Sequence, residues 1–167
     1  MIKNYVITIN DIPRSVQLAK RMIKSGTAHG ITTETFDAIT PRNTNVLEML
    51  QQEALPPARF AEVYSRTENC IAAFLSHYSL WKECVATNTT TTIFEHDAVV
   101  CNDIGNIVFD KVVSLGQPSY GKYKTPAFLG SGPLTSKRYF PGAHAYRVSP
   151  IGAKLLIERA KTHAAPT

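Results

Sequence analysis

Residues 5–36, YVITINDIPRSVQLAKRMIKSGTAHGITTETF, carry the pattern that decides the fold class. The run 5–9 is β-branched and apolar, and it stops at a polar turn with a proline, as a buried strand does. From Ser15, which suits a helix N-cap, apolar side chains recur at helical spacing as far as Gly26, which suits a helix end. Residues 31–36 are again β-branched. The stretch therefore predicts a strand, a helix and a second strand, the repeating unit of α/β sheets.

The rest of the chain continues this alternation. The longest predicted helix has an apolar stripe, and we expect it to bury Ile71, Phe74, Leu75, Tyr78, Trp81 and Val85. The other predicted elements are a short helix at 44–52, a strand at 90–94, a strand at 111–115 within an ambiguous run, a strand at 143–148 and a last helix from Ser149-Pro150. Residues 56–67 and 116–142 are predicted as loops. We therefore expect one domain over residues 1–167, an α/β sandwich around a mostly parallel sheet.

The composition fits one globular domain. The chain has 167 residues, of which 44% are hydrophobic and 19% charged, so it can hold a core without cross-links. No apolar run is long enough to span a bilayer, and the N-terminal residues read as a strand and not as an export signal. Cys70, Cys84 and Cys101 lack zinc-site spacing, so we expect reduced thiols in a cytosol-like compartment.

The net charge of +5 suits partners that carry negative charge. Phosphate-bearing ligands, nucleic acid and an anionic membrane surface all have this property. We do not expect nucleic acid, because the chain has no aromatic–basic sheet motif.

Polar residues follow three of the predicted strands, and ligands of α/β sheets collect at such strand ends. Asn10 and Asp37 follow the first two strands, and Glu95-His96-Asp97 follows the strand at 90–94. Two carboxylates that flank one residue suit Mg²⁺ or Mn²⁺, which completes its shell with substrate phosphates. The acid-x-acid turn therefore predicts a metal clamp for a diphosphate, and the alternative is a solvated turn that ends the strand.

Several other side chains have both a functional and a structural interpretation. His77 and Trp81 lie four residues apart with Ser76 beside them, and they either line a sugar or base pocket or belong to the core. Arg14, near a helix start, either meets a phosphate or lies on the surface. His144 shares a strand face with Tyr146, where it either binds a ligand or metal or bonds a backbone carbonyl.

Taken together, these pieces resemble glycosyltransferase family 25, the lipooligosaccharide-type galactosyltransferases. Five stretches are similar to motifs of that family and occur in its order: VITIND-x-x-R at 6–14, TFDAI at 35–39, AAFLSHYSLWKECV at 72–85, IFEHDAVV at 93–100 and GAHAYRVSPIGAKLL at 142–156. The resemblance spans residues 5–156, and the combination is specific although each piece is short.

The resemblance implies a GT-A-like, Rossmann-like α/β/α sandwich that transfers a hexose, galactose or glucose, with inversion. It implies a nucleotide-diphosphate sugar as donor, expected to be a UDP-sugar, a glycan or lipid-linked saccharide as acceptor, and Mn²⁺ or Mg²⁺ as cofactor. Carried over by position, Glu95 and Asp97 hold the metal, and His144 is a possible third ligand. The residues expected at the donor are Asn10, Arg14, Asp37, Ala38, Ser76, His77, Trp81 and Glu95.

The acceptor side is less well defined by the sequence. An inverting transfer needs a base for the acceptor hydroxyl and a Lewis acid for the departing diphosphate. The catalytic candidates are Asp97, Asp110 and His144, and Asp103 also lies near a strand end. The pattern does not rank them as the base.

Two departures from the family pattern favour an alternative function. His96 stands where the family motif has its middle acid, and the chain ends at Thr167, where relatives usually continue. We therefore expect a C-terminal, acceptor-side element to be missing, and a non-catalytic nucleotide- or glycan-binding module is the alternative. For either function we expect a cytoplasmic location, with peripheral membrane attachment as an option.

Overall fold

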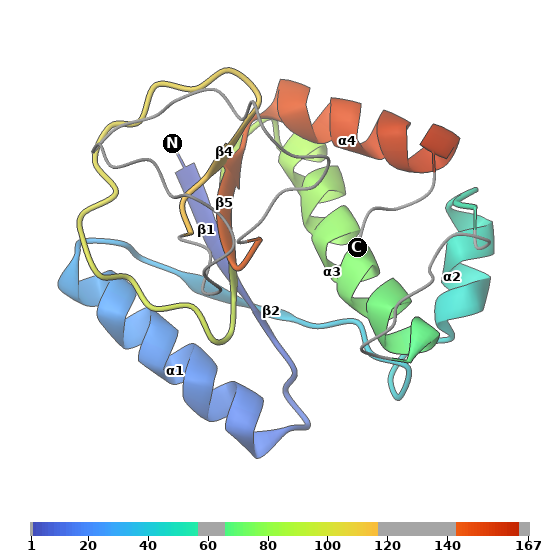
Figure 1. Cartoon of the computed structure of the whole chain (residues 1–167), viewed down its shortest axis with the longest axis horizontal. Coiled ribbons are helices and arrows are strands. Elements are labelled where there is room, and N and C mark those ends of the chain that lie inside the picture. Colours follow the sequence, from blue (N-terminus) through green and yellow to red (C-terminus); the bar gives the residue numbers. More distant parts are fainter. Residues whose placement is uncertain (1, 57–65, 117–142, 164–167) are drawn as a thin grey trace, which may run out of the picture.

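A computed structural model describes residues 2–56, 66–116 and 143–163 (Figure 1). Along these residues the elements are β1 (Ile2–Thr8), α1 (Pro13–Ala28), β2 (Glu34–Asp37), α2 (Val46–Gln52), α3 (Thr67–Ala86), β3 (Thr90–Glu95), β4 (Val112–Ser114), β5 (Ala145–Val148) and α4 (Pro150–His163). Most of the predicted loops at 56–67 and 116–142 lie outside the described residues. No helix in the described part is long and apolar enough to cross a membrane.

The strands form one mixed sheet in the order β2-β1-β3-β5-β4. β1 is parallel to both β2 and β3, whereas β5 is antiparallel to β3 and to β4. The expectation of a mostly parallel sheet is therefore only partly correct. The backbone N–H of Glu95 donates to the carbonyl of His144 at 2.9 Å, so the chain enters β5 where β3 ends and must run back along it.

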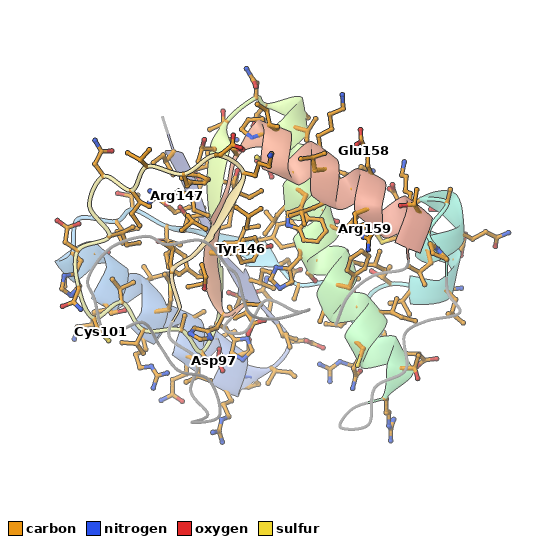
Figure 2. All side chains as sticks on the ribbon, turned by 45° about the horizontal axis from the view of Figure 1, so that its top comes forward. Asp97, Cys101, Tyr146, Arg147, Glu158 and Arg159 are labelled. Atoms are coloured by element: carbon orange, nitrogen blue, oxygen red, sulfur yellow. The ribbon has the colours of Figure 1, made fainter. Side chains whose placement is uncertain are left out.

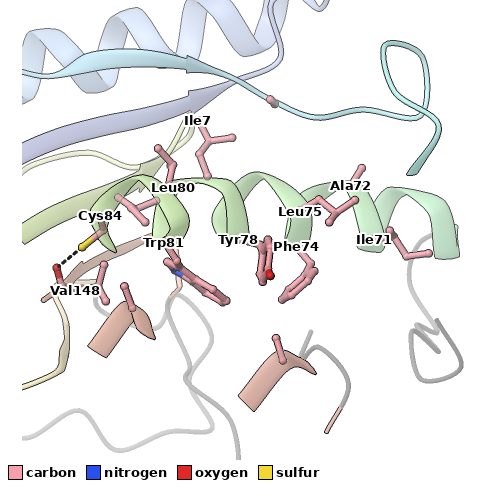
Figure 3. Packing of buried hydrophobic residues seen from close by; sticks show 14 of the residues in the cluster. Ile7, Ile71, Ala72, Phe74, Leu75, Tyr78, Leu80, Trp81, Cys84 and Val148 are labelled. Carbon is pink, nitrogen blue, oxygen red and sulfur yellow. Dashed lines mark hydrogen bonds between the residues drawn. The ribbon is translucent and has the colours of Figure 1, made fainter. Parts of the chain in front are cut away.

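Helices cover both faces of this sheet (Figure 1). α1 packs against one face, where Val6, Met22 and Phe94 are buried together. α3 and α4 cover the other face, and the larger apolar cluster lies there (Figure 3). The described part is thus a single mixed α/β domain with a helix layer on each side of the sheet.

The ends of α1 differ from the sequence prediction. The helix begins at Pro13, whose fixed φ suits a first turn, and Ile12 at the N-cap makes no side-chain bond. Ser15 is buried inside the helix instead, and its hydroxyl accepts a bond from the N–H of Ile9 at 2.9 Å. Gly26 does not end the helix either, because α1 continues to Ala28.

The stripe of α3 is correct except at its last position. Ile71, Phe74, Leu75, Tyr78 and Trp81 are buried as expected, but Val85 is 37% exposed. Cys84 takes the inward place in that turn, and its thiol lies 3.1 Å from the carbonyl of Thr89 and 3.7 Å from that of Val148 (Figure 3). With 3.6 residues per turn, the inward position after Trp81 falls at the third residue here and not the fourth.

The remaining elements occur close to their predicted positions. α2 begins two residues later than expected, because the side chain of Asn45 caps it by accepting from the N–H of Glu48 at 3.3 Å. The strands predicted at 31–36, 111–115 and 143–148 are present but shorter.

Candidate functional site

The candidate site lies where β1, β2 and β3 end on the same edge of the sheet. Thr8 pairs with Asp37, and Ile7 pairs with Glu95, so the parallel strands deliver their following residues to one edge. The antiparallel β5 starts there and brings His144 beside Glu95. The edge therefore gathers three of the predicted polar segments and one that is distant in sequence.

Glu95 is the most strongly perturbed acid at this edge. It is half-buried, and its Oε1 lies 3.7 Å from Nε2 of His77 on α3. Contact with His77 lowers the pKa of Glu95, burial opposes this, and charges on His144 and His96 lower the pKa further. Glu95 is therefore a carboxylate at neutral pH, in contact with the imidazole of His77 and under the influence of the charges of His144 and His96.

Tyr146 connects β5 to this group from inside the core. Its hydroxyl lies 2.9 Å from Nδ1 of His77 and accepts a hydrogen bond from Nε1 of Trp81 at 2.8 Å. The rings of His77 and Tyr146 stack with their centroids 5.7 Å apart. Burial raises the pKa of Tyr146 far above its ordinary value. From the sequence, Tyr146 is expected to share a face with His144 and help to bind a ligand or metal, whereas its hydroxyl contacts His77 and Trp81 in the core.

Trp81, Ser76 and Ala38 are buried and hold the framework of the edge. The indole N–H of Trp81 donates to the hydroxyl of Tyr146, so Trp81 occupies the position of a core residue. Ser76 accepts from the N–H of Ile39 at 2.9 Å and donates to the carbonyl of Ala72 at 3.0 Å. Ser76 thereby ties the turn after β2 to α3.

Asn10, Asp37 and Arg14 are exposed near the same edge. The turns after β1 and β2 are joined by an ion pair, in which Arg42 Nε lies 2.7 Å from Asp11 Oδ2. Asn10 and Asp37 are thus open to a ligand, and the turns that carry them are linked.

Two surface hollows have linings that do not include Glu95. Arg14 and Arg21 line one of about 490 Å³ on α1, with Pro13, Gln17 and Leu18. The other, of about 420 Å³, lies along residues 41–47 and Glu68. Neither lining includes a residue at the end of β3. The charged groups around Glu95, and not these hollows, mark the candidate site, because Glu95 lines neither hollow.

The other predicted acids differ in their position relative to this edge. Asp97 is exposed in the turn after β3, and its carbonyl accepts from Nη2 of Arg21 at 3.1 Å (Figure 2). Asp103 is also exposed and accepts from the N–H of Gly105 at 2.9 Å.

Asp110, one of the predicted catalytic residues, lies at the other end of the sheet from Glu95. It comes just before β4, whose first residue Val112 pairs with Val148, and Val148 in turn pairs with Thr91 near the start of β3. The antiparallel course of β5 turns β4 into the direction of β3. Asp110 therefore lies at the opposite edge from Glu95.

The metal-ligand prediction has only partial geometric support. Within the residues that the structure describes, no three His, Cys, Asp or Glu side chains gather as a metal-holding group. The triad of Glu95, Asp97 and His144 is therefore not assembled as a protein-only site. Two carboxylates remain a suitable donor set for a hard cation that also binds substrate phosphates.

Comparison with known proteins identifies the family. The model of glycosyltransferase family 25, described as LPS biosynthesis protein, matches residues 1–125. The match includes β1, β2, α3 and β3 with His77 and Glu95, and it ends before β5. A search of curated proteins gave no match. The match covers most of the chain, and its motifs are the ones that build the edge around Glu95, so the chain belongs to glycosyltransferase family 25.

Proposed function

We propose that the protein transfers a hexose, galactose or glucose, from a UDP-sugar to a glycan or lipid-linked saccharide in LPS biosynthesis. The observation that carries this proposal is the half-buried, ionised Glu95 at the end of β3, in a chain of this family. The parallel β2-β1-β3 half of the sheet, covered by α1, is consistent with a GT-A-like nucleotide-binding half.

The donor fits across the ends of β1 and β3. Asn10 and Asp37 are exposed there and offer hydrogen-bonding groups to the nucleoside, while His77 stands beside Glu95. In this arrangement Trp81 and Ser76 act from the core, by holding the residues that meet the donor.

A divalent cation, Mn²⁺ or Mg²⁺, is part of the proposal. Glu95 and Asp97 would hold it, because both offer hard oxygen ligands and Asp97 is open to solvent. When bound, the cation supplies Lewis-acid stabilisation to the departing diphosphate. His144, the third ligand expected from the sequence, is proposed as the base and not as a ligand, because a ring nitrogen that binds the cation cannot also accept a proton.

Inversion at the sugar needs a base that removes the proton of the acceptor hydroxyl. Of the three catalytic candidates, Asp97 and His144 are near the edge, whereas Asp110 is not. Because Asp97 is assigned to the cation, His144 is the described residue that we propose as base. His144 is near enough to affect the pKa of Glu95, which is consistent with a position next to the donor, and it acts as base in its neutral form.

Donor turnover tests this function directly. Purified protein is incubated with UDP-galactose, UDP-glucose and other nucleotide sugars with Mn²⁺, and released nucleotide is measured with and without saccharide acceptors. Glu95→Gln should lower turnover by at least about tenfold, while Glu158→Gln on the exposed face of α4 is the matched control. Equal turnover in wild type and Glu95→Gln would refute the assignment.

The alternative is a module that binds a nucleotide or glycan without turnover. His96, in place of an acid, favours it because it reduces the negative charge available to a cation. This alternative predicts UDP binding by calorimetry with no nucleotide release from any donor in the panel.

We also propose a peripheral location at an anionic membrane surface on the cytoplasmic side. α1 presents Arg14, Lys20, Arg21 and Lys24 to solvent and contains no acid, so it holds most of the net charge of +5.

Each basic residue near such a surface contributes about 1 kcal/mol to membrane binding. The double variant Lys20→Gln, Lys24→Gln should lower the affinity for anionic vesicles roughly 30-fold, as measured by co-sedimentation. The double variant Lys154→Gln, Lys161→Gln on α4 is the control. Equal loss in both pairs would contradict docking through α1.

A further inference from the structure

The hydroxyl of Tyr146 connects two segments that are far apart along the chain, α3 and β5. His77 and Trp81 come from adjacent turns on one face of α3, and both reach this one oxygen from β5. Tyr146 is 5% exposed, so the contacts form inside the protein. The Ser-His-x-x-x-Trp helix and the His-Ala-Tyr strand therefore meet at a single buried atom.

The chemistry of the three groups orders the hydrogen bonds. An indole N–H only donates, so the oxygen of Tyr146 is the acceptor of the bond from Trp81. The hydroxyl keeps its proton at neutral pH, as a phenol with an ordinary pKa of about 10 does. That proton can be directed at Nδ1 of His77, 2.9 Å away. A neutral imidazole that accepts at Nδ1 carries its own hydrogen on Nε2.

The carboxylate on the other side of the ring favours the same tautomer. Nε2 of His77 is the atom that lies 3.7 Å from Oε1 of Glu95. If the ring carried its hydrogen on Nδ1, the lone pair of Nε2 would face an ionised carboxylate oxygen, and two acceptors would repel each other. With the hydrogen on Nε2, the ring presents a donor to Glu95.

We propose that Tyr146 is a positioning residue that fixes His77 as its Nε2–H tautomer and so directs an N–H at Glu95. Trp81 assists by holding the Tyr146 oxygen in place. The role in donor binding rests on the proposed function of Glu95, whereas the tautomer assignment stands independently of it. The family match ends at residue 125, so Tyr146 lies in the part of the chain that this match does not cover.

Nitrogen-15 NMR of histidine-labelled protein tests the tautomer without any ligand. Spectra at pH 8 distinguish the Nε2–H form, the Nδ1–H form and the histidinium, and loss of signals in His77→Gln assigns the ring. Tyr146→Phe removes the hydroxyl with little change in shape. Tyr78→Phe is the matched control, because Tyr78 is also a buried tyrosine, on α3 itself, but its hydroxyl donates to Glu53 and not to a histidine.

We expect the Nε2–H form in the wild type and in Tyr78→Phe, and a mixture with the Nδ1–H form in Tyr146→Phe. An Nδ1–H form or a histidinium in the wild type at pH 8 overturns the proposal, as does an unchanged tautomer in a folded Tyr146→Phe. Should Tyr146→Phe not fold, the wild-type tautomer alone decides.

A second readout links the tautomer to the donor. Calorimetry with UDP and Mn²⁺ should show affinity lowered about tenfold in Tyr146→Phe, as for residues that orient a ligand-binding group, and unchanged in Tyr78→Phe. If the tautomer shifts but neither Tyr146→Phe nor Glu95→Gln changes UDP affinity, the positioning of His77 holds and the proposed function of Glu95 fails. Unchanged UDP affinity in Tyr146→Phe alone removes the donor-binding role of Tyr146.

Discussion

Gly152 is the position where one added methyl group should have the clearest effect on the fold. It lies in the first turn of α4, and a Cβ atom there would stand 2.1 Å from the carbonyl oxygen of Lys111 and 2.6 Å from its carbonyl carbon. These are main-chain atoms next to β4, and the same oxygen accepts a bond from the N–H of Ser149 at 2.9 Å. No flexible side chain can move aside, so Gly152→Ala must displace α4 or the strand.

The expected magnitude follows from two opposing effects. Overpacking a tight contact costs roughly 1–3 kcal/mol, and main-chain contacts this short place Gly152→Ala at the upper end. Alanine favours a helix over glycine by about 1 kcal/mol, which offsets part of the cost. The net loss in free energy of unfolding is then about 2 kcal/mol, and the melting temperature should fall by roughly 4–8 °C for a chain of this size.

Gly26 provides the matched control, because it is also a buried helical glycine. A Cβ atom there would meet the oxygen of Ile31 at 3.5 Å and Thr33 Oγ1 at 3.7 Å, which are ordinary contacts. Gly26→Ala should therefore leave the melting temperature unchanged or raise it. Thermal and urea denaturation of both variants test the comparison. A Gly152→Ala protein as stable as the wild type, or equal losses in the two variants, would refute the reasoning.

Two further predictions concern stability. Leu75→Ala should cost about 2–5 kcal/mol, because Leu75 is fully buried on the inward face of α3, whereas Val85→Ala should cost little; urea denaturation giving equal losses would contradict the burial assignment. Burial alone would raise the pKa of Glu83, but bonds from the Tyr5 hydroxyl and the Lys3 ammonium outweigh it and lower the pKa. Because the pKa of Glu83 is lower in the folded than in the unfolded protein, its ionised carboxylate stabilises the fold at any pH above the unfolded-state pKa. This stabilisation is lost as the pH falls through the folded-state pKa. Glu83→Gln should thus lose less melting temperature than the wild type between pH 7 and pH 3, and parallel curves would count against this.

The elements could be predicted from local sequence because each has a local cause. The β-branched run at 90–94 forms β3, and the apolar stripe from Ile71 to Trp81 packs α3 on the sheet. The boundaries were less accurate, since a proline at position 13 decided the start of α1 against the serine two residues later. Capping depends on backbone angles that several nearby residues compete to set.

The direction of β5 could not be predicted from its own residues. All four residues of β5 are buried, and the apolar and polar pattern of a strand is the same whether it runs parallel or antiparallel to its neighbour. That direction determines where two catalytic candidates lie, because it brings His144 to the edge with Glu95 and leaves Asp110 at the opposite edge. The direction in which β5 runs relative to β3 thus decides which residues reach the site, and the residues of β5 do not reveal that direction.

The acid-x-acid turn shows how a short motif relates to the layers of the fold. Residues two apart in a strand share a face, but the N–H of Ala98 bonds the carbonyl of Glu95 at 3.1 Å, so the chain turns before Asp97. Glu95 contacts α3 through His77, whereas the backbone of Asp97 contacts α1 through Arg21. The two acids are therefore attached to opposite helix layers. A cation held by both would therefore connect these layers across the end of β3, where the donor is proposed to lie.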